Sequence, residues 1–260
     1  TGSEAARGTI NGWVEGQTEK RIKDLIPLGG LDASTRLVLV NAIYFLGDWQ
    51  APFEKERTHP AKFHTSKTAS HDVPTMHQTG RHRFLAKDGV KLLELPYAGG
   101  AMSMVFALPD AVDGLEALES SLDAKKLDAW IGEMKAQQVE VSLPKFEIDP
   151  KGSLSLAGAL KELGMKTAFT PKADFTGIAD PPNPDEQLMI TAVFQKAFVK
   201  LDEKGTEAAA ASAVVMGEKG AAMPENAARF DADHPFMFFL RDNTSGLLVF
   251  MGRVADPKSK

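Results

Sequence analysis

The first strongly patterned segment of the chain is an apolar stripe near its start. Side chains on one helical face recur from Thr9 to Ile26. They are Ile10, Trp13, Val14, Thr18, Ile22, Leu25 and Ile26. This spacing predicts an amphipathic helix over residues 9–26, with one face that packs on a partner surface. Pro27 and the glycine pair at residues 29–30 predict its end.

The next segment, Leu37–Phe45, reads LVLVNAIYF and has no solvated face. A nearly continuous β-branched and aromatic run of this length predicts a central strand that is buried on both sides. Asn41 in its middle would then be a buried polar side chain that needs a hydrogen-bond partner.

The rest of the chain alternates short apolar runs with turns. Residues 59–97 predict short strands, and the runs at 92–97 and 102–108 flank Gly99–Gly100 as a hairpin. Helices are predicted around residues 115–122 and 127–134, with Asp123 as N-cap of the second, and over 156–163, ended by Gly164. Further strands are predicted over residues 139–148, 188–201, 236–240 and 247–254.

Strands and small groups of helices alternate without a regular βαβ repeat. This order favours an α+β fold with mainly antiparallel or mixed sheets. We find no internal repeat and no linker, so a single domain over residues 1–260 is predicted.

Composition narrows the possible classes of function. The chain has 43% hydrophobic and 25% charged residues, which excludes a collagen-like or wholly disordered protein. A net charge of −5 gives no electrostatic reason to expect nucleic-acid binding. The lack of cysteine removes disulfides, thiol nucleophiles and zinc-thiolate sites. No apolar run reaches the roughly 18 residues of a membrane helix, so no membrane partner is expected.

Candidate catalytic and metal-binding motifs are weak. His59, His64, His71, His77 and His82 occur in one region, but their spacing matches no metal-ligand pattern. We therefore expect surface histidines and no metal site. Nothing resembles the G-x-S-x-G motif of hydrolases, and Gly99–Gly100 is too short for a phosphate loop. We expect no catalytic residue and no cofactor.

The least ordinary segment is residues 203–226, EKGTEAAAASAVVMGEKGAAMPEN. Its composition fits a solvated loop or a short alanine-rich helix. As a strand, it would place Thr206, Ala208, Ala210, Ser212 and Val214 on one small, uncharged face. Such a face could insert between two existing strands, so the segment could be a loop in one state and a strand in another.

Here the sequence resembles a known family. DEKGTEAAAASAVVM, residues 202–216, closely resembles the hinge and reactive-loop start of inhibitory serpins. LVLVNAIYFLGDWQAPF (37–53) resembles strand three of sheet A, and VEVSLPKFEI (139–148) resembles strand six. Residues 234–257 resemble the C-terminal hairpin of sheet B, and the first helix resembles helix F.

The resemblance covers essentially the whole chain and implies a serpin fold: a mixed sheet A, sheets B and C, and surrounding helices. The chain resembles a bacterial-type member that lacks the N-terminal part of the domain. Residues 1–260 would be one serpin domain from the helix F-like segment to the C-terminus, with a reactive loop at about 203–233. A targeting segment would lie in the absent part, and we expect an extracellular or periplasmic location.

The resemblance also implies a function. Inhibitory serpins are suicide substrates: a serine protease cuts the reactive loop, which then inserts into sheet A while the acyl-enzyme persists. The protein would be a monomeric inhibitor rather than an enzyme, and its partner would be the target protease. The alternatives are a non-inhibitory serpin with a chaperone, carrier or storage role, or an inactive fragment.

The resemblance assigns roles to individual residues. The hinge would comprise Glu203, Gly205, Thr206, Glu207, Ala208, Ala209, Ala210, Ala211 and Ser212. The family usually cuts fourteen residues after the hinge glycine, which gives the bond Lys219–Gly220 and a trypsin-like target. Met216, Glu218, Met223 and Arg229 remain alternatives for the cut.

The breach and shutter of sheet A can also be assigned by resemblance. Glu203 would form an exposed ion pair with Lys145 at the breach, and Trp49 would anchor the exit of the third strand. Asn41 matches the shutter asparagine, and Gln195 stands where many members carry a histidine. The Gln195 amide can hydrogen-bond Asn41, but pH sensitivity from a histidine would be lost.

Overall fold

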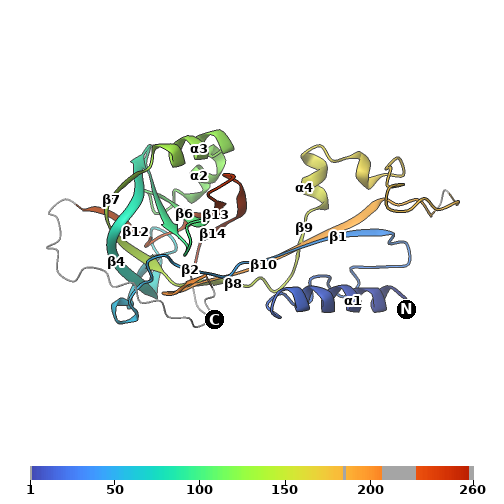
Figure 1. The fold of residues 1–260 in the computed structure, drawn as a ribbon, viewed down its shortest axis with the longest axis horizontal. Helices are drawn as coiled ribbons and strands as arrows, with labels where there is room; N and C mark the ends of the chain where they lie inside the picture. Colours follow the sequence, from blue (N-terminus) through green and yellow to red (C-terminus); the bar gives the residue numbers. More distant parts are fainter. Residues whose placement is uncertain (1, 184–185, 207–226, 258–260) are drawn as a thin grey trace. The chain divides into compact units, whose positions relative to one another are not determined.

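The computed structural model describes residues 2–183, 186–206 and 227–257. The chain divides into two compact units (Figure 1), one of residues 1–44 and 148–199, the other of residues 45–147 and 200–260. Helices, parallel strand pairs and antiparallel strand pairs all occur, as expected for a mixed α+β fold. The single domain stays a prediction.

The first unit is built around one parallel strand pair. It contains α1 (Gly2–Gln17), β1 (Leu37–Tyr44), β9 (Leu154–Ser155), α4 (Ala157–Glu162), the 3-10 helix η2 (Thr167–Phe169) and most of β10 (Ile190–Leu201). β1 runs parallel to β10, and β9 runs antiparallel to it. Val14, Ile22, Leu25 and Phe198 form its buried core.

The predicted helix over residues 9–26 is wrong in its bounds. α1 begins at Gly2 and ends at Gln17, and the chain then reverses at Glu19 and Lys20, which have φ angles of 49° and 60°. The reversal returns Ile22 to the core, where the side chain is fully buried. The apolar stripe is real, but a helix and a returning segment share it.

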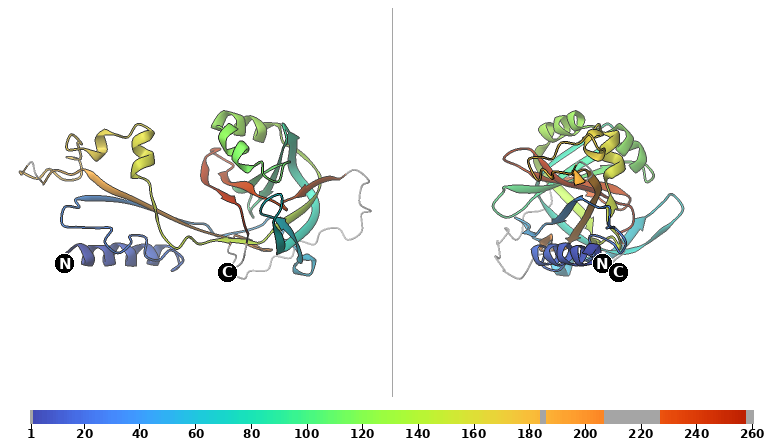
Figure 2. Two further views of the ribbon diagram at one scale, coloured as in Figure 1. Left: turned by 180° about the vertical axis from the view of Figure 1, so that it is seen from behind. Right: turned by 90° about the vertical axis from the view of Figure 1, so that its right-hand side faces the viewer.

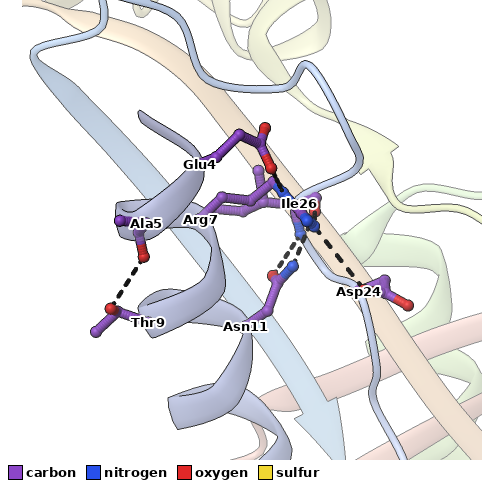
Figure 3. Close-up of polar contacts among 7 residues, drawn as sticks. All are labelled: Glu4, Ala5, Arg7, Thr9, Asn11, Asp24 and Ile26. Atoms are coloured by element: carbon purple, nitrogen blue, oxygen red, sulfur yellow. Dashed lines mark hydrogen bonds and ion pairs between the residues drawn. The ribbon is translucent and has the colours of Figure 1, made fainter. Parts of the chain in front are cut away.

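A buried asparagine holds the returning segment against α1. The Asn11 amide nitrogen donates to the Ile26 carbonyl at 2.9 Å, and the Ile26 amide donates to Asn11 Oδ1 at 2.8 Å (Figure 3). Arg7, paired with Glu4 at 2.9 Å, also donates to the Ile26 carbonyl. Asn11 is only 5% exposed, so this reciprocal pairing satisfies its polar atoms where water is excluded.

The prediction of a central strand at residues 37–45 is also wrong. Among the described strands β1 is paired with β10 alone, and none of its side chains is fully buried. Leu39 is 39% exposed, and Asn41 is exposed. A continuous apolar run indicates that both sides of a strand favour burial, but it does not show which residues cover them. The described residues leave one side of β1 uncovered.

The second unit contains a large twisted sheet. In the described residues, eight strands form it: β3 (His59–His64), β4 (Ser70–Lys87), β5 (Val90–Pro96), β6 (Met102–Pro109), β7 (Lys135–Pro144), β12 (Ala228–Asp231), β13 (Phe236–Asp242) and β14 (Leu248–Val254). Their order is β12-β7-β4-β5-β6-β13-β14, with β3 beside β4. β12 and β7 are parallel, and the other pairs are antiparallel.

Two helices cover part of this sheet (Figure 2). α2 (Leu115–Ser121) and α3 (Ala124–Glu133) pack Leu118, Trp130 and Ile131 against buried side chains of β5, β6 and β13. The Asp123 carboxylate accepts a hydrogen bond from the Lys126 amide at 2.7 Å, which confirms the predicted N-cap. The predicted hairpin of β5 and β6 around Gly99–Gly100 and the C-terminal pair β13–β14 are confirmed.

Two strand predictions need correction in this unit. Residues 70–87 form one 18-residue strand, β4, instead of several short ones, because it exchanges partners along its length, from β3 to β7 to β5. The predicted strand over residues 139–148 is interrupted at Lys145 and forms β7 and β8 (Phe146–Ile148). β7 pairs with β4 and β12, so most of this segment belongs to the large sheet.

The remaining elements of the second unit are short. β2 (Gly47–Asp48) and the 3-10 helix η1 (Lys55–Arg57) follow β1, and β11 (Gly205–Thr206) follows β10. β11 pairs antiparallel with Leu201 at the end of β10 and with both residues of β2. This small arrangement positions the candidate site.

Candidate functional site

The candidate site is centred on the hinge turn, which we define as residues Asp202–Thr206. At its start the Glu203 carboxylate accepts hydrogen bonds from Lys145 Nζ, at 2.8 and 3.1 Å, and from the Thr58 hydroxyl at 2.9 Å. The expected ion pair of Lys145 and Glu203 is thus confirmed. Its expected exposure is wrong, because the Glu203 side chain is only 7% exposed, while that of Lys145 is 35% exposed.

Burial and hydrogen bonding act on this carboxyl in opposite directions. Burial raises the pKa of Glu203, but hydrogen bonds from Lys145, the backbone and Thr58 outweigh it, so the pKa lies below its usual value. Glu203 is therefore ionised at neutral pH, and its partners hold the second residue of the hinge turn.

Trp49 forms hydrogen bonds with the backbone of the same turn. Its indole nitrogen donates to the Asp202 carbonyl at 3.1 Å, and its amide donates to the Lys204 carbonyl at 2.7 Å. The Phe53 amide donates to the Glu203 carbonyl at 2.8 Å. Trp49 was expected to anchor the exit of the preceding strand, and the structure places this side chain against the hinge turn.

Gly205 occupies a position that only glycine can fill. Its φ angle is +155°, and a Cβ atom there would clash with the Gly47 carbonyl oxygen and lie 2.8 Å from the Asp48 Cα. The missing side chain lets β11 approach β2 closely enough for their backbones to pair. The assignment of Gly205 to the hinge stays a prediction, and this close approach is consistent with it.

Thr206 is the last hinge residue that the structure describes. Its side chain is fully buried, and its hydroxyl lies 2.6 Å from the hydroxyl of Tyr97. The Tyr97 ring stacks on Trp49 with centroids 4.5 Å apart and an interplanar angle of 16°. Burial raises the pKa of Tyr97 despite the bond to Thr206, so the phenol stays neutral. Tyr97 could not be identified from the sequence, because its position before a glycine turn gives no signal of a partner 109 residues away.

The candidate shutter pair lies in the first unit. Gln195 Nε2 donates to Asn41 Oδ1 at 3.4 Å, in the register that pairs these residues across β1 and β10. The hydrogen bond is confirmed, whereas the expected burial of Asn41 is wrong for the reason given for β1. Its role as a shutter stays a prediction.

Other residues of the predicted loop lie outside the described part of the chain. These are the hinge residues Glu207, Ala208, Ala209, Ala210, Ala211 and Ser212, the bond Lys219–Gly220, and the alternatives Met216, Glu218 and Met223. Arg229 is described; it lies in β12 and its guanidinium is 3.3 Å from Glu140.

The histidines include one clear exception to the expected surface positions. His82 is only 7% exposed, because it lies on the covered face of β4, and burial lowers its pKa to about 4. His59 is exposed, whereas His64, His71 and His77 are half-buried. Within the described residues no group of three metal-ligating side chains is placed to hold an ion. Nor does any described helix have the length and apolarity to cross a membrane.

Comparison with known proteins identifies the family. Residues 1–257 match the family model "Serpin (serine protease inhibitor)". The chain is 39% identical to human Serpin B3, over 98% of this chain and 64% of that protein. It is 41% identical to leukocyte elastase inhibitor of Sus scrofa, over 98% of this chain and 67% of that protein.

Solved structures agree with these relatives. Human thyroxine-binding globulin in complex with thyroxine matches with a TM-score of 0.84 and 28% identity, over 98% of this chain and 65% of that one. Serpin48 of the insect Tenebrio molitor matches with a TM-score of 0.83 and 34% identity, over 97% of this chain and 65% of that one, and this match confirms the predicted serpin fold. The chain spans less than two thirds of the length of Serpin B3. With the family model, the relatives and the architecture in agreement, the chain belongs to the serpin family of serine protease inhibitors.

Proposed function

We propose that the protein is a suicide-substrate inhibitor of serine proteases with trypsin-like specificity. Serpins act as inhibitors rather than catalysts, and one relative is named for inhibition of an elastase. The proposal concerns the activity of the full natural chain, because the sequence spans 64% of Serpin B3. We also propose an extracellular or periplasmic location and a monomeric state.

The observation that carries the proposal is the position of β11. Gly205 and Thr206 pair antiparallel with Leu201 on one side and with Gly47 and Asp48 on the other. A strand that continued from this start would run along β10, where β1 now pairs with it, so insertion would replace the pairing of β1 with β10. The following residues are small, which suits a segment that must slide past packed side chains.

The proposed chemistry belongs to the protease. Its serine oxygen attacks the carbonyl carbon of Lys219, the bond to the Gly220 nitrogen breaks, and Gly220 leaves as a free amine. An ester then joins the protease serine to Lys219. Lys219 suits a protease whose specificity pocket holds an acidic residue. Insertion of the cut segment would distort the protease before water hydrolyses that ester.

Incubation of the full natural chain with trypsin tests the proposal. We expect a covalent complex that survives SDS denaturation. Mass spectrometry should show that the peptide released by cleavage begins at Gly220. Lys219→Ala should abolish the complex, whereas Arg229→Ala is the matched control and should not. A peptide that begins elsewhere would correct the scissile bond, and clean cleavage without a complex would refute inhibition.

A carrier role is the alternative, favoured by the match to thyroxine-binding globulin. It predicts saturable binding of a thyroxine-like ligand, measurable through the fluorescence of the three tryptophans. Ligand binding in a protein that forms no covalent complex with any serine protease would favour the carrier role.

A further inference from the structure

Thr206 already occupies a defined place between two strands. Its backbone pairs with Leu201 at the end of β10 and with Gly47 of β2. Its side chain is fully buried, and the hydroxyl lies 2.6 Å from that of Tyr97. The first strand position of the predicted insertion is therefore occupied and held by a side-chain contact.

Tyr97 is itself held rigidly. Its ring stacks on Trp49 and meets the edge of Phe45, with centroids 4.8 Å apart and an interplanar angle of 69°. The neighbouring Ala98 amide donates to the Asp48 carbonyl at 2.8 Å, and Trp49 forms an isolated β-bridge with Tyr97. Tyr97 is only 3% exposed, so water cannot readily replace Thr206 as the hydrogen-bond partner of its hydroxyl.

We infer that Tyr97 is a positioning residue which keeps Thr206 in the first position of the inserting strand and thereby sets the rate of loop insertion. The inference rests on the proposed inhibitory function. The role proposed for Tyr97 requires no contact with the protease or the scissile bond. It acts through Thr206, and the role would link the turn between β5 and β6 to the hinge.

The physical reason is that insertion competes with hydrolysis of the acyl-enzyme. A strand whose first pair is already formed needs no separate nucleation step, so it extends from an ordered end. Without the Tyr97 hydroxyl, Thr206 would leave its place more often, and the strand would restart from an unpaired end. The loss of one neutral hydrogen bond corresponds to a change of roughly five-fold.

The test measures the limiting rate of covalent-complex formation by the full natural chain at saturating trypsin. Tyr97→Phe should lower this rate roughly five-fold and increase the fraction of cleaved, uncomplexed inhibitor. Ser120→Ala is the control, because it removes an exposed hydroxyl in α2, which belongs to neither the hinge turn nor the strands beside it. This control should leave the rate unchanged.

Further variants separate positioning from general stability. Thr206→Val should reproduce the effect of Tyr97→Phe, and Thr206→Ser, which keeps the hydroxyl, should restore most of the rate. The double variant Tyr97→Phe with Thr206→Val should be no slower than either single variant. Hydrogen exchange of the Thr206 amide should also accelerate in Tyr97→Phe.

The outcomes distinguish the inference from the function beneath it. If the wild-type chain forms no covalent complex, the proposed function fails, and the inference fails with it. If the wild type traps trypsin and Tyr97→Phe traps it at the same limiting rate, the role of Tyr97 is refuted and inhibition stands. Independent effects of the two substitutions in the double variant would also refute it.

Discussion

Removal of the Lys145 side chain should destabilise the protein by more than a surface ion pair would. Lys145→Ala would leave the Glu203 carboxylate, which is only 7% exposed, with Thr58 as its remaining side-chain donor. Exposed ion pairs contribute about 0–1 kcal/mol, whereas loss of one partner from a fully buried pair costs about 3–5 kcal/mol. Because Lys145 is 35% exposed, water can partly replace it, and we expect a loss of about 2 kcal/mol.

Thermal unfolding followed by circular dichroism measures this loss. For a chain of this size, about 2 kcal/mol corresponds to a fall in Tm of roughly 4–8 °C. Lys62→Ala is the matched control: Lys62 lies 2.9 Å from Asp72, but both side chains are more than half exposed. We expect little change in that control.

The pH dependence provides a second check. The pKa of Glu203 is lower in the folded than in the unfolded protein, so its contribution to stability is present above the unfolded pKa. It is lost as the pH falls through the folded pKa. The difference between wild type and Lys145→Ala should therefore shrink in acid. Equal unfolding midpoints at pH 7, or a difference that does not change in acid, would refute this account of the site.

Three further predictions concern neighbouring features. Gly205→Ala should displace β11 from β2, because its Cβ would clash with the Gly47 carbonyl, and the Thr206 amide should lose its protection from hydrogen exchange; retained protection would argue against the close approach. Thr206→Arg would place a charge in a fully buried position, so trypsin should cut the loop without forming a stable complex, and an undiminished yield of complex would refute it. Burial lowers the pKa of His82 to about 4, so the unfolded chain binds a proton at this histidine before the folded protein does. The free energy of unfolding should therefore fall by roughly 3 kcal/mol in total as the pH falls from about 6.5 to 4. In His82→Gln, the free energy of unfolding measured with denaturant should depend less on pH over this range. An unchanged pH dependence would contradict the assignment.

Local signals in the sequence predicted local structure well. The glycine pair at residues 99–100 gave the hairpin of β5 and β6, and Asp123 gave the start of α3, because each signal acts within a few residues. The apolar stripe at residues 9–26 gave the wrong end for the first helix, because hydrophobic periodicity alone does not show where the chain reverses. The same face is continued by a segment that returns after Glu19 and Lys20.

Only part of the candidate site could be predicted from the sequence, because some of its contacts depend on how distant segments meet. Glu203, Gly205 and Thr206 were found through one segment that resembles a family motif, and Lys145 through a second. The structure brings Lys145 to the hinge turn that contains the other three. Tyr97 could not be found in this way, because its contact with Thr206 depends on how β2, β5 and β11 meet. The burial of Glu203 likewise depends on the chain around Thr58.

The close approach of Gly205 to Gly47 has a consequence for engineering. A Cβ atom at Gly47 would lie 2.9 Å from the rings of Phe45 and Tyr97, so both glycines are fixed by the same packing. A loop segment transplanted from a related serpin would therefore retain a native junction only when it starts after Thr206. A donor cassette that begins earlier would have to bring its own counterparts of Gly47 and Tyr97, which makes this junction a practical boundary for designing new specificities.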